Sequence, residues 1–407
     1  MKIFLSIVLF VQSVAFFSSC GTTDGLAPGG CTYDKEWTMQ DEWTFDTAYN
    51  TDLRSLAVKN NYLFSIGEAG LSSTAAWCYV RRSDDDGKTW KTVDLYRPAS
   101  SDKVCRPFMV RTWSSTVISC GLTYDSLNVG KWMMRRSTDN GETWQTVDDS
   151  WRLATGKHAS CKSIKKIGNK IFAAGSAQDS SSVYHLIIKR SDDDGASWQT
   201  VDDQQSISGE GLGAAGRYIA TIGTDIYVSA TSTVNSVSGM VTRVSSDGGT
   251  TWSTVDTPWY YQAGKSVSNL DFMAQGSTLF RSMYSQDSSN KYKWLIQKSA
   301  DYGRSWNIID DYQDGGGDTF AREMAVDYNS IWVVGSSTDP TTSKNTWLVR
   351  KSEDLGGSWK IVDEVRSSSL SNIANNIQIR DSNVFVGGKF YSSSNKSRAA
   401  VRALWCR

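Results

Sequence analysis

The segment Ser83-Asp84-Asp85-Asp86-Gly87-Lys88-Thr89-Trp90 recurs five more times along the chain. The later copies read STDNGETW, SDDDGASW, SSDGGTTW, SADYGRSW and SEDLGGSW, and their tryptophans are Trp144, Trp198, Trp252, Trp306 and Trp359. Successive tryptophans are 54 residues apart, except for the last pair, which is 53 apart. A fixed period of this length indicates a repeat architecture.

Each repeat has the same internal plan around this motif. In the first repeat, an apolar stretch at residues 56–58 precedes a second that ends at Gly67 and a third that ends in Arg81-Arg82. The motif follows, and then an outer strand from Trp90 to Asp94. Four short strands in each repeat are typical of one propeller blade. Since no segment shows a 3.6-residue apolar period, a solenoid of helices is excluded and the sequence predicts an all-β propeller.

The motif resembles the Asp-box, or bacterial neuraminidase repeat, of sialidase-like propellers, and the six copies extend over nearly all of the chain after residue 30. We term the six copies the aspartate turns. The third residue of each is expected to accept backbone N–H groups, and the glycine supplies a positive φ. These aspartates are Asp85, Asp139, Asp193, Asp247, Asp301 and Asp354. The loops lack the liganding Glu of an EF-hand, so we expect structural turns, with no metal and no cofactor.

The two ends of the chain are predicted to share one blade. Residues 36–42 align with residues 197–203, which places an outer strand before the first repeat. Residues 373–379, 384–388 and 399–403 supply three strands without a fourth. Six whole blades and this composite predict a seven-bladed ring that the N-terminal strand closes, leaving no edge to pair. Cys31 and Cys406 would then flank the joint, and we predict a disulfide between them.

The N-terminal residues predict export. Lys2 and an apolar run over residues 3–17 precede Ser18-Ser19-Cys20, which resembles a bacterial lipoprotein signal with Cys20 as the acylated residue. We expect a signal segment at 1–20, a flexible tether at 21–30 and a single propeller domain at 31–407. The protein is expected at the outer membrane or cell surface, and we expect the lipid anchor to be its only attachment to the membrane. A periplasmic or secreted protein is the alternative.

Cysteine number and charge add further expectations. Besides Cys20 there are six cysteines, an even number that suits an oxidising compartment. Cys78, Cys105, Cys120 and Cys161 can pair in three ways, which the sequence leaves open. Lys and Arg total 43, as do Asp and Glu, and there is no basic run, so we expect no nucleic-acid partner. We expect a monomer.

Ligand-binding residues are expected on one face. In propellers of the resembling family, ligands meet the face opposite the Asp-box turns, where this chain has many loop aromatics, including Trp151 and Trp259. Such rings suit sugars or an extended peptide; the alternative is that they fill gaps between blades. The 54-residue offset also puts four innermost-strand residues in one column, which would form a partly basic arc: Asp52, Arg106, Arg322 and Asn375.

Two interpretations of this arc remain open. Arginines around a carboxylate suit the recognition of an anion, but Arg–Asp pairs can equally join neighbouring blades. A two-residue shift in the last two blades would instead align Arg322 with Arg54 and Lys162. The candidates for ligand binding are therefore the two tryptophans and the four residues of the arc, and we assign no catalytic residue.

The resemblance also raises the question of catalysis. Sialidases use three arginines for the substrate carboxylate, a Tyr nucleophile with a Glu partner and an Asp acid/base. Their early Phe/Tyr-Arg-Ile-Pro signature is missing from this chain, and they have six blades. His158 and His185 belong to no visible catalytic or metal-binding set. We therefore predict a binding module for glycan or peptide ligands. The alternatives are a scaffold for envelope or membrane-protein assembly and a sialidase-like exo-glycoside hydrolase.

Overall fold

The computed structural model describes residues 32–34, 36–72, 75–97, 104–205 and 214–406. The signal segment, the tether, Cys20 and Cys31 lie outside these ranges. The described residues form strands and turns, and among them no helix is long and apolar enough to span a bilayer. The all-β prediction is confirmed for this part of the chain.

The strands form antiparallel units of four, each built from neighbouring segments of the chain except the last. The units are β2 (Thr51–Lys59), β3 (Tyr62–Ser72), β4 (Ala75–Ser83) and β5 (Lys91–Tyr96); β6 (Val104–Trp113), β7 (Thr116–Tyr124), β8 (Gly130–Ser137) and β9 (Gln145–Asp148); β10 (Ala159–Ile167), β11 (Lys170–Gln178), β12 (Tyr184–Ser191) and β13 (Gln199–Gln204); β14 (Ala214–Ile222), β15 (Asp225–Val234), β16 (Val237–Ser245) and β17 (Ser253–Thr254); β18 (Val267–Gln275), β19 (Thr278–Gln286), β20 (Tyr292–Ser299) and β21 (Asn307–Tyr312); β22 (Thr319–Asp327), β23 (Ser330–Thr338), β24 (Asn345–Ser352) and β25 (Lys360–Val365); and β26 (Asn372–Arg380), β27 (Asn383–Tyr391) and β28 (Ser397–Leu404) with β1 (Thr38–Trp43).

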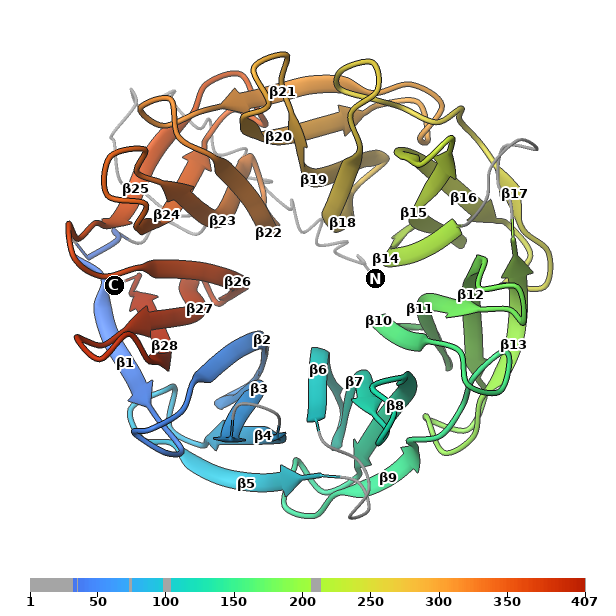
Figure 1. Cartoon of the computed structure of the whole chain (residues 1–407), viewed down its shortest axis with the longest axis horizontal. Helices are drawn as coiled ribbons and strands as arrows, with labels where there is room; N and C mark the ends of the chain where they lie inside the picture. The colour runs from blue at the N-terminus through green and yellow to red at the C-terminus, as the bar shows by residue number, and fades with distance from the viewer. Residues whose placement is uncertain (1–31, 35, 73–74, 98–103, 206–213, 407) are drawn as a thin grey trace, which may run out of the picture.

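These units are arranged radially around a central axis (Figure 1). The first strand of each unit, from β2 to β26, lies nearest the axis, and the fourth strand lies at the rim. The first two units are joined into one sheet by a single parallel pair, Ala76 with Val104. The last unit combines both ends of the described chain, because β1 pairs with β28, Thr38 opposite Ala403. Each innermost strand also contains an irregularity in its pairing with the second strand.

The aspartate turns connect the third and fourth strands of the first six units, and side chains hold each turn closed. In the first turn, Asp85 Oδ1 accepts the Thr89 N–H at 2.8 Å and Oδ2 accepts the Thr89 hydroxyl at 2.6 Å. These bonds to Thr89 lower the pKa of Asp85 to about 2. Gly87 has a φ of +90°, a conformation that glycine adopts without strain, and its carbonyl accepts the Trp90 indole N–H. The turn therefore needs no metal to close it.

Large aromatic side chains fill the space between units. Trp132, Trp294, Trp332 and Trp347 are among the largest fully buried side chains. Second-strand glycines make room for them: a Cβ on Gly175 would lie 2.1 Å from the Ser160 carbonyl oxygen and 2.7 Å from the Trp132 ring. The glycine that ends the second apolar stretch of the repeat is thus required by close packing.

A repeated ion pair ties each outer strand to the third strand of the next unit. The pairs are Asp41–Arg81, Asp94–Arg135, Asp148–Lys189, Asp202–Arg243, Asp310–Arg350 and Asp363–Arg402. In β20 the equivalent position is Gln297, and Arg281 of the neighbouring strand β19 takes over, 3.7 Å from Asp256. The aspartate four residues after the tryptophan of each outer strand therefore joins adjacent units.

Candidate functional site

A pocket of about 490 Å³ opens on the face opposite the aspartate turns, where β2 and β6 begin and β3 ends. We term it the upper pocket. Its lining is mostly polar and comes from several strands and the loop after β27: Tyr49, Asn50, Asp52, Arg54, Glu68, Gly70, Ala75, Ala76, Val104, Arg106 and Lys396. Two of the predicted ligand-binding residues, Asp52 and Arg106, are among them.

Asp52 is held on one side of this pocket by groups from the last unit. Its carboxylate accepts hydrogen bonds from Lys389 Nζ at 2.8 Å and from the Ser397 hydroxyl at 2.5 Å. Burial by itself raises the pKa of Asp52, but Lys389 and Ser397 outweigh it and the net pKa is below the ordinary value. Asp52 is therefore a carboxylate at neutral pH.

Glu68 holds two arginines in place on the other side. Its Oε1 lies 2.7 Å from Arg54 Nη2 and accepts a hydrogen bond from Arg106 Nε at 2.9 Å. Burial lowers the pKa of Arg106, but Glu68 outweighs it and the net pKa is raised, so the charge is permanent. Three cationic side chains thus line the pocket with Asp52 and Glu68, namely Arg54, Arg106 and Lys396, and a fourth, Lys389, is bound to Asp52. The group carries an excess of positive charge.

Arg322 and Asn375 do not stand in the same column as Asp52 and Arg106, which corrects the simple 54-residue alignment. Both lie at the pairing irregularity of their strand, as Arg54 and Lys162 do. The connections into β22 and β26 are shorter: Arg322 follows Trp306 by 16 residues, whereas Phe108, at the irregularity of β6, follows Trp90 by 18. The alternative with a two-residue shift is the one that the structure has.

Arg322 is nevertheless close enough to Arg54 of the upper pocket to feel its charge. Burial lowers its pKa, and the charge of Arg54 lowers it further. Its buried Nε has no hydrogen-bond partner in the described residues. Asn375, in contrast, donates its amide to the Leu53 carbonyl at 2.7 Å and so ties β26 to β2. Arg322 remains a ligand-binding candidate, whereas Asn375 has a structural bond.

The two predicted tryptophans lie elsewhere. Trp151 packs edge-on against Trp132, and the Lys189 ammonium lies 3.8 Å from the centre of its ring. Trp259 exchanges backbone hydrogen bonds with Met240 and packs on a buried cluster from the fourth and fifth units. Neither residue lines the upper pocket. Their contacts match the alternative in which these rings fill gaps between blades.

The structure shows part of the cysteine pairing. Cys78 and Cys105 form a disulfide between β4 and β6, directly before Arg106, while Cys120 and Cys161 are free and buried. Cys406 is also disulfide-bonded. Its predicted partner, Cys31, lies outside the described residues, so that pairing stays a prediction. The described residues include no cluster of three or more His, Cys, Asp and Glu suited to a metal ion.

Sequence reasoning missed Glu68, Lys389 and Lys396, which complete the charge pattern of the upper pocket. Glu68 stands in the second strand of its unit, Lys389 lies within β27, and Lys396 is the last residue of the loop after it. In the sequence, the one sign that Glu68 has a special role is that this charged residue directly follows Gly67, which ends the second apolar stretch.

Comparison with known proteins identifies the fold but no family. No family model matches the chain, and no curated protein sequence matches it. Among solved structures, the sialidase of Trypanosoma rangeli in complex with sialic acid is similar at a TM-score of 0.52 and 10% identity. That likeness covers 94% of this chain, which spans only 59% of the sialidase.

Two further structures are similar over most of the chain. The phage phi92 endosialidase has a TM-score of 0.54 at 9% identity, covering 92% of this chain and 69% of its own. The polysaccharide lyase Uly1 has a TM-score of 0.56 at 11% identity, covering 97% and 94%. At such identities the likeness concerns the fold alone, and that fold is a sialidase-like β-propeller.

Proposed function

We propose that this propeller is a binding module for acidic glycans and that the upper pocket binds their carboxylate or sulfate groups. The observation that carries the proposal is the charge at the pocket: three cationic side chains line it, and a fourth, Lys389, is bound to Asp52, against two carboxylates. Glu68 holds Arg54 and Arg106 side by side, so their free N–H groups are preorganised for an anion. Tyr49 and Asn50 at the rim supply a ring and an amide for a sugar.

The same geometry favours binding over hydrolysis. A general acid that works near neutral pH needs a carboxyl whose pKa is raised. In the upper pocket the pKa of Asp52 is lowered, and Glu68 is engaged by two arginines. Both carboxylates therefore orient cations, and the similarity to glycan-acting propellers supports a glycan as the ligand class.

The test is a screen of the purified protein on an array of neutral and acidic glycans, followed by calorimetric titration. Arg106→Ala and Arg54→Ala each remove a charge-assisted hydrogen bond worth roughly 1.5–3 kcal/mol, so Kd is expected to rise roughly 10- to 150-fold. The matched control is Arg366→Ala, because this exposed arginine at the start of the connection from β25 to β26 is bound by Asp314 and Glu364.

Three results would contradict the proposal. They are binding of neutral glycans only, binding that the two pocket variants leave unchanged, and capture of an acidic peptide or an envelope protein with no glycan bound. Release of free sugar from the bound glycan would favour the hydrolase alternative.

We further propose that the propeller has seven blades, that the N-terminal strand closes the ring, and that Cys20 anchors it to the outer membrane. The pairing of β1 with β28 supports closure, and the four-stranded units support the blade number. The Cys78–Cys105 disulfide fits an exported protein, since such bonds persist in oxidising compartments. Membrane fractionation of the Cys20→Ser variant tests the anchor.

A further inference from the structure

A second cavity, of about 530 Å³, lies near the axis between the innermost strands, beyond their pairing irregularities. We term it the axial cavity. Six innermost strands, from β6 to β26, contribute to its wall. It lies toward the aspartate turns, because Lys166 in its wall forms an ion pair at 3.1 Å with Asp194 of the third turn. It is therefore distinct from the upper pocket, with which it shares no lining residue.

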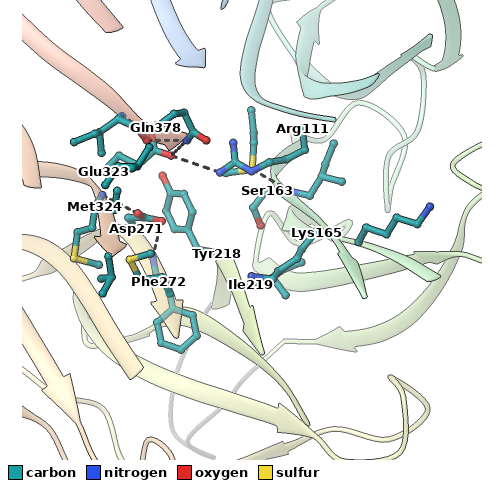
Figure 2. A pocket seen from close by; sticks show the side chains of 18 of the residues that line it. Arg111, Ser163, Lys165, Tyr218, Ile219, Asp271, Phe272, Glu323, Met324 and Gln378 are labelled. Carbon is teal, nitrogen blue, oxygen red and sulfur yellow. Dashed lines mark hydrogen bonds and ion pairs between the residues drawn. The ribbon is translucent and has the colours of Figure 1, made fainter. Parts of the chain in front are cut away.

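One side of the axial cavity carries two carboxyl groups whose acceptor atoms satisfy backbone N–H groups. Asp271 Oδ2 accepts the Met324 N–H at 2.9 Å, and Glu323 Oε2 accepts the Ile377 N–H at 3.3 Å. Figure 2 shows both carboxyl groups on one side of the cavity, with Tyr218 projecting between them and the opposite side. These acids have a structural role, since each caps an N–H of the next innermost strand.

The opposite side carries two cations. Arg111 and Lys165 extend from β6 and β10, as Figure 2 shows. Arg111 Nη1 donates to its neighbour's carbonyl, and Nη2 lies 3.5 Å from Glu323, a long contact for an ion pair. Burial lowers the pKa of Lys165, and the charge of Arg111 lowers it further. Within the described residues, the Lys165 ammonium has no hydrogen bond or ion pair.

The protonation of Glu323 decides the charge balance. Burial raises the pKa of Glu323 to about 8, and Asp271 adds to this, while Arg111 opposes it. Arg111, Lys165, Lys166 and Asp271 are the other charged groups in the wall, and Gln378 Nε2 is a neutral donor 3.4 Å from Glu323. With Glu323 neutral and Lys166 paired with Asp194, two cations face one carboxylate. The cavity thus offers a neutral carboxyl donor beside unbalanced positive charge.

We propose that the axial cavity is a binding site for a small anion, a sulfate or an organic carboxylate, held between Arg111 and Lys165. The anion completes the coordination of the Lys165 ammonium and replaces the weak contact of Arg111 with Glu323. Protonated Glu323 donates its hydrogen to the anion instead of repelling it. A cavity of this size admits an anion as large as a sugar acid.

The experiment titrates inorganic sulfate and glucuronate into Arg106→Ala protein by calorimetry, so that the upper pocket is already weakened. Lys165→Met is expected to raise Kd about tenfold or more at pH 6.5, since it removes a charge-assisted donor. The matched control is Lys293→Met, because this ammonium lies outside the cavity wall, is bound by Asp311 at 3.0 Å, and its loss leaves affinity unchanged.

A third variant tests the role of the proton. Glu323→Gln is a permanent neutral donor that keeps an oxygen for the Ile377 N–H, so it retains affinity at pH 6.5. Affinity of the parent falls between pH 6.5 and pH 9, and this fall is smaller in Glu323→Gln. Since Lys165→Met removes a half-buried charge with no hydrogen bond or ion pair in the described residues, it is not expected to lower the thermal midpoint.

Three results would overturn the proposal: no binding of either anion at millimolar concentration, equal loss in the Lys165 and Lys293 variants, or a pH dependence that Glu323→Gln leaves unaltered. Loss of glycan binding at the upper pocket has no bearing on these outcomes, because the titration protein already lacks Arg106.

Discussion

Breaking one of the repeated inter-unit ion pairs is expected to cost several kcal/mol, although ion pairs at protein surfaces rarely do. The perturbation is Arg135→Met. Arg135 donates two hydrogen bonds of 2.8 Å to the Asp94 carboxylate, and its guanidinium lies 4.1 Å from the centre of the Tyr96 ring. The two side chains are only 8% and 13% exposed. Without Arg135, a nearly buried carboxylate loses both of these hydrogen bonds.

The magnitude follows from burial. Removing one partner of a buried pair costs about 3–5 kcal/mol, whereas an exposed pair contributes about 0–1 kcal/mol. A second ion pair with the same distance serves as a control. Arg398 lies 2.8 Å from Glu42 in the pair that links β28 and β1, but these side chains are 47% and 38% exposed. Arg398→Met is therefore expected to cost less than about 1 kcal/mol.

The assay is urea unfolding followed by tryptophan fluorescence, with the free energy of unfolding compared at equal slope. Asp94→Asn in the Arg135→Met background is expected to recover part of the loss, because no unpaired charge then remains buried. Equal effects of Arg135→Met and Arg398→Met would refute the reasoning, and so would a double variant less stable than Arg135→Met.

Four further predictions follow from the same structure. In the folded protein the pKa of most turn aspartates is lowered to about 2, whereas in the unfolded chain it is about 4. The stability that these aspartates contribute is therefore present above pH 4 and is lost as the pH falls toward 2. Thermal midpoints measured from pH 7 to pH 2 check this, and a midpoint that stays level contradicts it. Asp193→Ala is expected to lower the thermal midpoint while the folded protein keeps its glycan affinity, because the turn lies opposite the upper pocket. Trp151→Ala is likewise expected to lower the thermal midpoint and leave glycan affinity unchanged, since its ring packs on Trp132. A loss of affinity without a loss of stability would show that Trp151 contacts the ligand. Peptide mapping without reductant is expected to recover Cys31 and Cys406 in one linked peptide, and two free thiols would exclude that bond.

The sequence predicted a basic arc but not its composition. Asp52 and Arg106 lie in the upper pocket as expected, whereas Trp151 and Trp259 pack between strands and Asn375 bonds to the Leu53 carbonyl. Constant-offset alignment carries over from one repeat to the next only while the loops keep their length. The alignment failed at Arg322 because the segment from Trp306 to the pairing irregularity of β22 is two residues shorter than the segment from Trp90 to that of β6.

By itself the sequence determined the repeated unit, its four strands and the turn that ends the third strand. These features are local: Asp85 bonds to Thr89 four residues later, and Gly87 adopts its positive φ within the same turn. Only the tertiary structure decided which side chains share a cavity. Glu68, Lys389 and Arg106 come from three different strands, and Glu323 and Lys165 face each other across the axis. Such neighbours depend on packing between distant segments, which no short stretch of the chain encodes.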